Sequence, residues 1–243
     1  MPKVGIITQA RMTSTRLPGK ILLFSGGKIV LHHHIHRLQW SGLPVFVATT
    51  NNQSDKPVVD FCTANNFSYF RGDEFNVLER FTFCARMHEL DTIIRVTSDC
   101  PLIDGNIIAE GLDKYQQLRN DKIYYSNCIQ RTYPRGLDFE IFSRQLLEDA
   151  YENATLEADK EHVTPYINQN RSGSVVLEHH TSQPDYSDLR WTLDTPDDWT
   201  LLDSLLQKYN AGNLRYEDII AILIKNPTLK ALNTHVKQKE VNL

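Results

Sequence analysis

The chain has 243 residues, of which 41% are apolar and 23% are charged, and its formal net charge is −4 at pH 7. These values are typical of a folded globular protein and exclude a disordered or collagen-like chain. Without a basic face or a long apolar span, the sequence predicts neither a nucleic-acid nor a membrane partner. The four cysteines are scattered without a C-x-x-C pair, so we expect buried thiols in a cytoplasmic protein.

The first elements alternate between strand and helix. Residues 3–8, K-V-G-I-I-T, are apolar and β-branched without polar alternation, as in a strand covered on both faces of a parallel sheet. Residues 28–40 have apolar side chains near helical spacing, and S-G-L-P at 41–44 ends that pattern before a second buried strand at 45–50. This β-loop-α-β unit predicts a parallel sheet with right-handed crossovers.

The same alternation continues toward the C-terminus. We expect further helices at 55–66, 74–90, 104–118, 143–153, 199–209 and 216–225. Further strands are expected at 68–71, 91–99, 122–128, 175–179 and 189–193, with an alternating segment whose Leu137, Phe139 and Ile141 share a face. The helix near 199 has Thr195 as its predicted N-cap, followed by Pro196 and two aspartates in the first turn. The pattern predicts an α/β protein.

The most informative stretch is the loop at 9–20, Q-A-R-M-T-S-T-R-L-P-G-K, which directly follows the first strand. It contains three cations, Arg11, Arg16 and Lys20. Cations and small donors after a buried strand are typical of a site for a phosphorylated ligand. The plainer alternative is a solvated basic loop.

Two better-known phosphate loops are excluded at this stretch. A Walker A loop requires G-x-x-x-x-G-K-[ST], but Ser14 stands at the first glycine position and Ile21 follows the lysine. A G-x-G-x-x-G run is also absent from the sequence. The loop therefore favours a triphosphate held through side-chain cations.

Two aspartates, Asp99 and Asp194, each follow a predicted strand. Ligands of open α/β sheets bind at the carboxyl ends of the strands, where the basic loop also lies. Two carboxylates together with phosphate oxygens and water form a ligand set for Mg²⁺. The alternatives are a turn residue for Asp99 and a helix cap for Asp194. With the cations and no evident nucleophilic triad, the pattern predicts phosphoryl or nucleotidyl transfer by positioning and charge neutralisation.

Four histidines lie close together, His32, His33, His34 and His36. His32 and His36 share one helix face, which suggests a metal site. However, zinc usually takes three or four protein ligands, and no H-E-x-x-H pattern is present. We interpret the four as ordinary helix residues.

Five segments, in this order, resemble the cytidylyltransferases that activate acidic sugars as CMP-sugars, and in particular the SpsF-type branch related to the acylneuraminate and ketodeoxyoctonate enzymes. They are Q-A-R-M-T-S-T-R-L-P-G-K-I-L (9–22), V-T-S-D-C-P-L-I-D (96–104), R-G-L-D-F-E-I-F (135–142), E-H-V-T-P-Y-I (161–167) and R-W-T-L-D-T-P-D-D (190–198). The resemblance implies a single domain over residues 1–243 with a three-layer, Rossmann-like nucleotide-diphospho-sugar transferase fold and a mostly parallel, mixed central sheet. It also implies an acceptor-binding and dimerisation region at about 125–185, and hence a homodimer.

In the implied reaction, the anomeric hydroxyl of an acidic sugar attacks the α-phosphorus of CTP and displaces pyrophosphate, for surface polysaccharide or glycoprotein glycan synthesis. Asp99 and Asp194 match the Mg²⁺ carboxylates of the family, and Ala10 lies where the backbone approaches the nucleotide. The positions that match triphosphate-binding cations are Arg11, Arg16 and Lys20. Those that would act in catalysis are Arg11, Lys20 and Asp99.

One departure from the related ketodeoxyoctonate enzymes concerns the base. Those enzymes read V-Q-G-D, with the glutamine near cytosine, whereas this chain has Thr97 followed by Ser98. A short hydroxyl does not reproduce the two hydrogen bonds of an amide. Arg80, in N-V-L-E-R-F, is a candidate to compensate near the base.

The acceptor candidates are Arg135, Asp138 and His162. Arg135, in the P-R-G turn, is the first choice for the sugar carboxylate because a planar guanidinium pairs with it bidentately. His162 is a candidate to contact sugar hydroxyls or to assist deprotonation. The alternatives are a surface arginine and a structural histidine.

Three rival functions remain open at this stage. The first is a nucleotidyltransferase of the same fold that uses another nucleotide or another acceptor. The second is a non-catalytic ligand-binding relative, and the third is a glycosyltransferase, although its D-x-D motif is not found. The identity of the acidic sugar also stays open.

Overall fold

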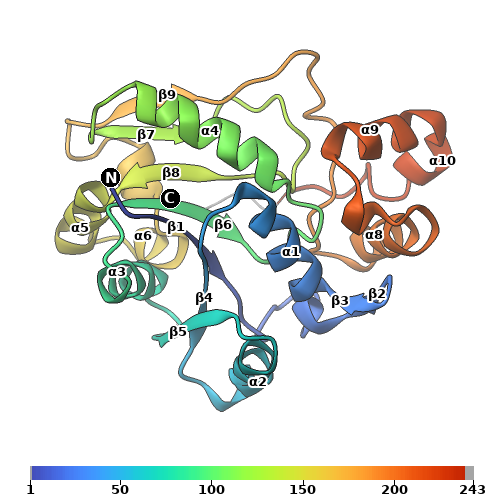
Figure 1. Ribbon diagram of the computed structural model, residues 1–243, viewed down its shortest axis with the longest axis horizontal. Helices are drawn as coiled ribbons and strands as arrows, with labels where there is room; N and C mark the ends of the chain where they lie inside the picture. The colour runs from blue at the N-terminus through green and yellow to red at the C-terminus, as the bar shows by residue number, and fades with distance from the viewer. Residues whose placement is uncertain (1, 239–243) are drawn as a thin grey trace.

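The computed structural model describes residues 2–238 and is built on a seven-stranded sheet in the order β5-β4-β1-β6-β8-β7-β9 (Figure 1). The strands are β1 (Val4–Gln9), β4 (Val45–Thr50), β5 (Ser68–Gly72), β6 (Thr92–Thr97), β7 (Ile123–Ser126), β8 (Glu140–Ser143) and β9 (Val176–His179). Strand β8 is antiparallel to both of its neighbours, and the other pairs are parallel. The predicted mostly parallel, mixed sheet is confirmed.

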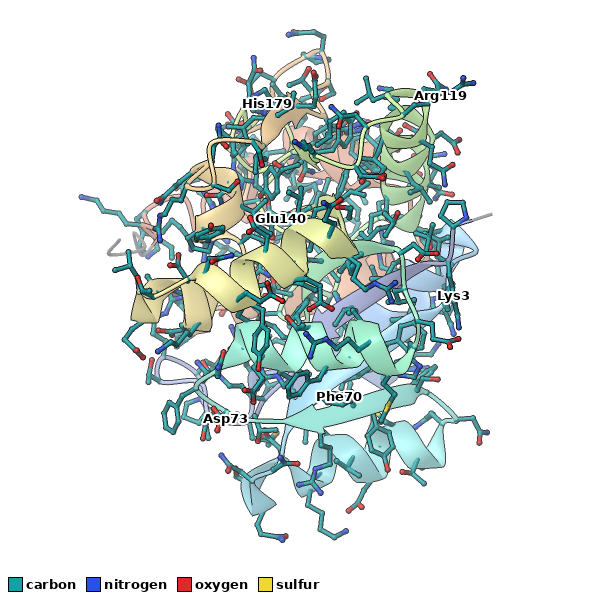
Figure 2. The ribbon with its side chains drawn as sticks, turned by 90° about the vertical axis from the view of Figure 1, so that its left-hand side faces the viewer. Lys3, Phe70, Asp73, Arg119, Glu140 and His179 are labelled. Carbon is teal, nitrogen blue, oxygen red and sulfur yellow. The ribbon has the colours of Figure 1, made fainter. Side chains whose placement is uncertain are left out.

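Helices cover both faces of the sheet. The main ones are α1 (Val30–Leu38), α2 (Lys56–Ala64), α3 (Val77–Met87), α4 (Gly105–Gln117) and α5 (Arg144–Asn153). Helices α1, α2 and α4 lie on one face, while α3 and α5 lie side by side on the other (Figures 1 and 2). Two short helices, α6 (Glu157–His162) and α7 (Pro165–Asn168), extend the second layer. The result is the three-layer α/β arrangement.

The C-terminal part of the described chain packs beside one edge of this core. It consists of α8 (Pro196–Tyr209), α9 (Tyr216–Lys225) and α10 (Pro227–Lys230), next to the hairpin β2 (Phe24–Ser25) and β3 (Lys28–Ile29) (Figure 1). Helix α8 begins with the predicted Thr195 cap: its hydroxyl accepts from the Asp198 N–H, and the Asp198 carboxylate accepts from the Thr195 N–H. No helix within the described range is long and apolar enough to cross a membrane.

The central strands β1 and β6 carry apolar side chains on both faces because both faces are covered by helices. On β1, Ile6 packs into the cluster with α1 and α4, whereas Ile7 packs into the cluster with α3 and α5. Ile94 and Ile93 divide in the same way on β6. Successive side chains of a strand point to opposite faces, so a strand between two helical layers needs no polar face.

The predicted strand at 189–193 is wrong. Within this segment, Arg190 forms only an isolated bridge with Arg135, and the Trp191 N–H donates to the Arg135 carbonyl at 2.8 Å. The Leu193 N–H donates to the Asp99 carbonyl at 2.7 Å. The segment is extended because it pairs with loops, not with the sheet, and Asp194 therefore does not follow a sheet strand.

The histidine helix α1 is held through two of its imidazoles, one of which contacts β1 and the other the β2–β3 hairpin. His34 is fully buried, with Nε2 at 2.9 Å from the Thr8 hydroxyl and Nδ1 at 2.9 Å from the Cys100 carbonyl. Burial lowers the pKa of His34 to about 4, so its imidazole is neutral at pH 7. His33 lies 2.9 Å from the Ser25 carbonyl. Both contacts are structural. The four cysteines are free, and three of them are buried while Cys128 is partly exposed.

Candidate active site

Two acidic side chains, Asp55 and Glu74, shape the loop after β1. Asp55, which is fully buried, accepts from the Met12 N–H at 2.7 Å and from the Thr50 hydroxyl at 2.5 Å. The loop closes at Gly19, where φ is +68° and the N–H donates to the Met12 carbonyl at 3.1 Å. A positive φ favours glycine, and Lys20 follows at the start of a short 3₁₀ helix, Lys20–Leu22.

Lys20 joins the two predicted carboxylates. Its Nζ donates to Asp99 Oδ2 at 2.8 Å, to Asp194 Oδ1 at 2.9 Å and to the Leu193 carbonyl at 2.6 Å. Burial alone lowers the pKa of Lys20, but Asp99 and Asp194 outweigh it, so the pKa is raised. Burial likewise raises the pKa of Asp99, and Lys20 reverses this and holds it at about 2. At pH 7 Lys20 and Asp99 are therefore both charged.

The three loop cations do not converge on one point. Arg16 joins Lys20 on Asp194, with its guanidinium 3.0 Å from Oδ1. Arg11 lies instead 3.8 Å from Glu74, beyond β5. Glu74 also accepts from the Thr13 hydroxyl at 2.5 Å and from the Asn52 amide, which fastens the loop to that side. Arg16 and Lys20 therefore face the carboxylates, and Arg11 faces the β5 end of the site.

The other residues predicted to bind the nucleotide lie in two parts of the site. Arg80 is buried on the Arg11 side, where it donates to the Asp73 carbonyl at 2.7 Å. Burial and the nearby Arg11 lower its pKa to about 10. Ala10 and Ser98 are buried, and their N–H groups donate to the carbonyls of Ala48 and Gln9.

A cleft of about 490 Å³ opens beside the Lys20 cluster. The predicted residues that line it come from the loop after β1, the end of β6, the turn before β8, helix α6 and the segment before α8: Arg16, Thr97, Asp99, Arg135, Asp138, His162 and Asp194. The structure thus brings both predicted Mg²⁺ carboxylates and all three acceptor candidates to one cavity. Its volume is in the range of small-molecule sites.

Arg135 is the cation in this cleft that is open to a ligand anion. It is half-buried, and within residues 2–238 its guanidinium has no hydrogen bond or ion pair. Burial and the neighbouring Arg131 lower its pKa. Arg131, in contrast, is neutralised by Asp138, which also accepts from the Gly136 N–H at 3.3 Å. A half-buried guanidinium without a partner is suited to a carboxylate.

Asp99 and Asp194 supply oxygen donors that fit a hard divalent cation. Both carboxylates reach the same Nζ atom of Lys20, so they lie close together. In the part of the chain that the structure describes, no third histidine, cysteine or carboxylate joins them in a metal-binding group. Mg²⁺ typically takes one or two carboxylates and completes its shell with water and substrate phosphates. The donor set therefore fits a cation that arrives with a nucleotide.

Sequence reasoning missed four polar residues of this region, Gln9, Arg95, Arg190 and Gln238. Gln9 pairs in register with Thr97, lines the cleft, and has a buried Oε1 without a hydrogen-bond partner among the described residues. Arg95 lines the cleft and is paired with Glu140. Both were within reach, because Arg95 and Thr97 share one face of β6 shortly before Asp99, and Gln9 is the first residue of the stretch at 9–20. No sequence pattern near Gln238 indicates that it belongs to the site.

A family model described as cytidylyltransferase matches residues 5–211 of the chain. The spore coat polysaccharide biosynthesis protein SpsF of Bacillus subtilis is 30% identical over 239 residues, which cover 93% of this chain and 96% of that protein. The uncharacterized protein MJ1063 of Methanocaldococcus jannaschii is 34% identical over 244 residues, or 98% and 97% of the two chains.

Among solved structures, a cytidylyltransferase from Leptospira borgpetersenii superposes on this chain with a TM-score of 0.91 and 33% sequence identity. The match covers 99% of this chain and 100% of that one. The three-layer nucleotide-diphospho-sugar transferase fold implied by the motifs is confirmed.

Proposed function

Because the chain belongs to the cytidylyltransferase family, and is therefore a nucleotidyltransferase, we propose that it couples CTP to an acidic sugar and releases pyrophosphate. One observation carries the proposal: the cleft joins the Lys20–Asp99–Asp194 cluster to Arg135, a cation with no partner among the described residues. The Lys20–Asp99–Asp194 cluster suits a nucleoside triphosphate with its metal ion, and Arg135 suits the carboxylate of an acceptor. Relatedness to a protein of polysaccharide synthesis supports a sugar acceptor.

The loop after β1 is proposed to hold the triphosphate. Arg16 lines the cleft, and Lys20 is paired with Asp99 and Asp194, which also line it, so both cations would stabilise negative charge on the α-phosphate and on the departing pyrophosphate. Arg11 binds the same nucleotide from the β5 side. Charge stabilisation by fixed cations requires no covalent intermediate on the protein.

Asp99 and Asp194 are proposed to hold Mg²⁺, which when bound neutralises charge on the phosphates. The base is proposed to lie near Ala10, Arg80, Thr97 and Ser98. Gln9 adds an amide beside Thr97, and its unpaired Oε1 is a ready acceptor for a ligand N–H or O–H. An amide at this place would supply the two hydrogen bonds that a threonine alone does not.

The acceptor is proposed to bind at the Arg135 end of the cleft. Arg135 pairs with the carboxylate, which orients the anomeric hydroxyl toward the nucleotide, and Asp138 and His162 line the same wall for the other hydroxyls. Residues of about 125–185 then form the acceptor region and, we propose, the interface of a homodimer. Edge strand β9 supports this because Val176 and Leu177 are exposed there. A monomer in light scattering would contradict the dimer.

Replacing Arg135 with alanine is expected to raise the KM for the acidic sugar about 100-fold and to leave the KM for CTP nearly unchanged. The estimate follows from losing hydrogen bonds to a charged group, at roughly tenfold for each. Steady-state kinetics with each substrate varied in turn measures the split. A matched control is Arg119→Ala. Arg119 is exposed, and in Figure 2 it lies at the opposite end of the molecule from Asp73, whose carbonyl accepts from Arg80. A rise confined to the KM for CTP would remove Arg135 from the acceptor site.

The second candidate is a nucleotidyltransferase that uses another nucleotide. It is favoured by Thr97, which stands where the related ketodeoxyoctonate enzymes have the glutamine of V-Q-G-D. Thermal unfolding with each nucleoside triphosphate and Mg²⁺ separates the two. We expect CTP to raise the Tm most, because ligand binding to the folded state alone stabilises it. A larger shift with UTP or ATP would replace CTP in the proposal.

A further inference from the structure

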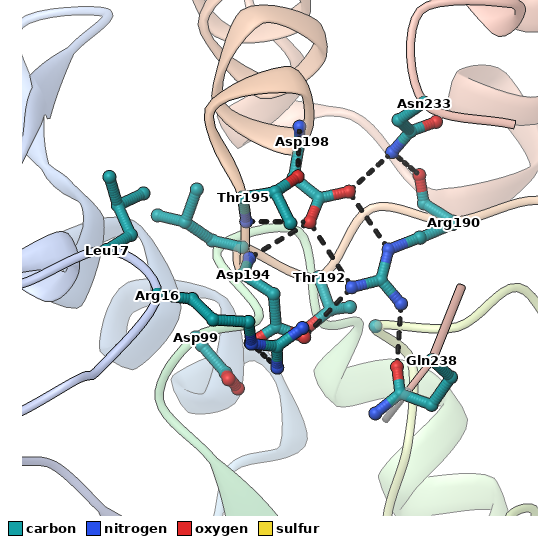
Figure 3. A network of polar contacts seen from close by, with 12 residues as sticks. Arg16, Leu17, Asp99, Arg190, Thr192, Asp194, Thr195, Asp198, Asn233 and Gln238 are labelled. Carbon is teal, nitrogen blue, oxygen red and sulfur yellow. Dashed lines mark hydrogen bonds and ion pairs between the residues drawn. The ribbon is translucent and has the colours of Figure 1, made fainter. Parts of the chain in front are cut away.

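The carboxylate of Asp194 is held from two sides. Lys20 and Arg16 both approach Oδ1, at 2.9 Å and 3.0 Å. On the other side, Arg190 donates to Oδ2 at 2.8 Å (Figure 3). Because each oxygen is paired with different cations, the carboxylate cannot rotate without losing an ion pair.

Arg190 is itself fixed by Asp198. Its Nε donates to Asp198 Oδ1 at 2.9 Å, and its Nη2 donates to Oδ2 at 3.2 Å. Asp198 Oδ2 also accepts from the backbone N–H groups of Asp194 and Thr195, each at 3.0 Å. Asp198 is fully buried, and Arg190 is only 8% exposed. The side chain and the backbone of Asp194 are therefore set by the same buried arginine–carboxylate pair.

The C-terminal segment completes this arrangement from outside the matched family region, which ends at residue 211. Asn233, which is 2% exposed, donates to Asp198 Oδ1 at 2.8 Å and to the Arg190 carbonyl at 3.1 Å. Gln238 accepts from Arg190 Nη1 at 2.7 Å (Figure 3), and it also lines the cleft. His235 lies 2.9 Å from Asp197, which draws the segment along the start of α8.

We propose that Arg190 is the positioning residue for Asp194 and that the C-terminal segment, residues 233–238, holds Arg190 in place through Asn233 and Gln238. The inference deepens the proposed function and rests on it, because Asp194 is the proposed metal carboxylate. A carboxylate positions a cation only if its own orientation is fixed, and hydrogen bonds to its outer oxygen provide that. The segment thereby sets how tightly the site takes a metal–nucleotide complex.

The simpler alternative is that Arg190 only stabilises the fold around the start of α8. The two roles predict different measurements. A structural role lowers the Tm and leaves the affinity of the folded protein for metal unchanged. A positioning role weakens metal binding in protein that remains folded.

The test is a Mn²⁺ titration of the full-length protein at a fixed CTP concentration, with free Mn²⁺ followed by electron paramagnetic resonance and the Tm recorded in parallel. Arg190→Lys keeps one charge but cannot contact Asp194, Asp198 and Gln238 together. We expect it to raise the Mn²⁺ dissociation constant about 10- to 100-fold, as for other partners of metal ligands. Exposed Gln238→Ala is expected to raise it about two- to tenfold by removing one hydrogen bond.

Two controls complete the design. Gln238→Glu keeps an acceptor for Arg190 and should restore tight Mn²⁺ binding, while Lys237→Ala, exposed and adjacent, should match the wild type. Unchanged Mn²⁺ affinity in both Arg190→Lys and Gln238→Ala would overturn the inference, and if Arg190→Lys does not fold, Gln238→Ala decides alone. If the wild-type protein itself binds no Mn²⁺ in the presence of CTP, both the proposed function and this inference fail.

Discussion

Asp99→Asn is expected to lower the turnover of CTP about 1000-fold while the protein stays folded. Asp99 is a carboxylate at pH 7, because Lys20 reverses the effect of burial and holds its pKa at about 2. Asparagine keeps the shape and removes the charge. Removing one preorganised electrostatic group typically costs about 10²- to 10³-fold in kcat, and the proposed metal would lose one of its two carboxylates as well.

The fold should tolerate this change. Lys20 keeps the Asp194 carboxylate and the Leu193 carbonyl as acceptors, so its ammonium is not left unpaired. Asp91→Asn is a matched control. Asp91 directly precedes β6, whereas Asp99 lies beyond its other end, and the exposed Asp91 carboxylate contacts the Lys3 N–H and Arg144. Pyrophosphate release and the Tm of both variants check the prediction. Near-normal turnover of Asp99→Asn would refute the metal role.

Lys20→Ala is expected to reduce kcat/KM for CTP about 100- to 1000-fold, and it should also lower the Tm. Lys20 is the one cation that contacts both Asp99 and Asp194 within residues 2–238, and it faces the proposed triphosphate. Its loss removes charge stabilisation from the transferred phosphate. It also leaves Asp99 and Asp194 close together without the cation between them, which destabilises the fold.

The stability loss should stay moderate for a physical reason. Arg16 and Arg190 still neutralise Asp194, and the Asp99 side chain is 22% exposed, so water screens part of its charge. Lys28→Ala, an exposed lysine on the nearby hairpin, is the control and should behave like the wild type. Unchanged kinetics of Lys20→Ala with CTP would exclude Lys20 from the nucleotide site.

Much of the fold could be predicted from the sequence where local pattern and tertiary environment agree. Strand β4 spans the predicted residues, and α9 does as well, because each is bounded by clear breaks. The segment 189–193 shows the limit. An extended apolar stretch has the same pattern whether its backbone groups pair with a sheet or with loops, and here they pair with loops.

The candidate site could be predicted from the sequence only where the sheet topology brings residues together. The convergence of Asp99 on the basic loop follows from the parallel sheet, since β1 and β6 are neighbours and end at the same edge. The separation of Arg11 from Arg16 and Lys20 was not predictable, because Asp55 and Glu74, distant in sequence, shape the loop. Gln238 lies 48 residues beyond its partner Arg190, and no local pattern indicates that contact.

The most direct measurement incubates the purified protein with CTP, Mg²⁺ and a panel of acidic sugars, and records pyrophosphate release together with the product mass. We predict pyrophosphate in equal amount to one new product, whose mass is that of the acid plus CMP less one water. Neither pyrophosphate nor a CMP adduct with any acid in the panel, or adducts only with another nucleotide, would contradict the proposed cytidylyl transfer to an acidic sugar.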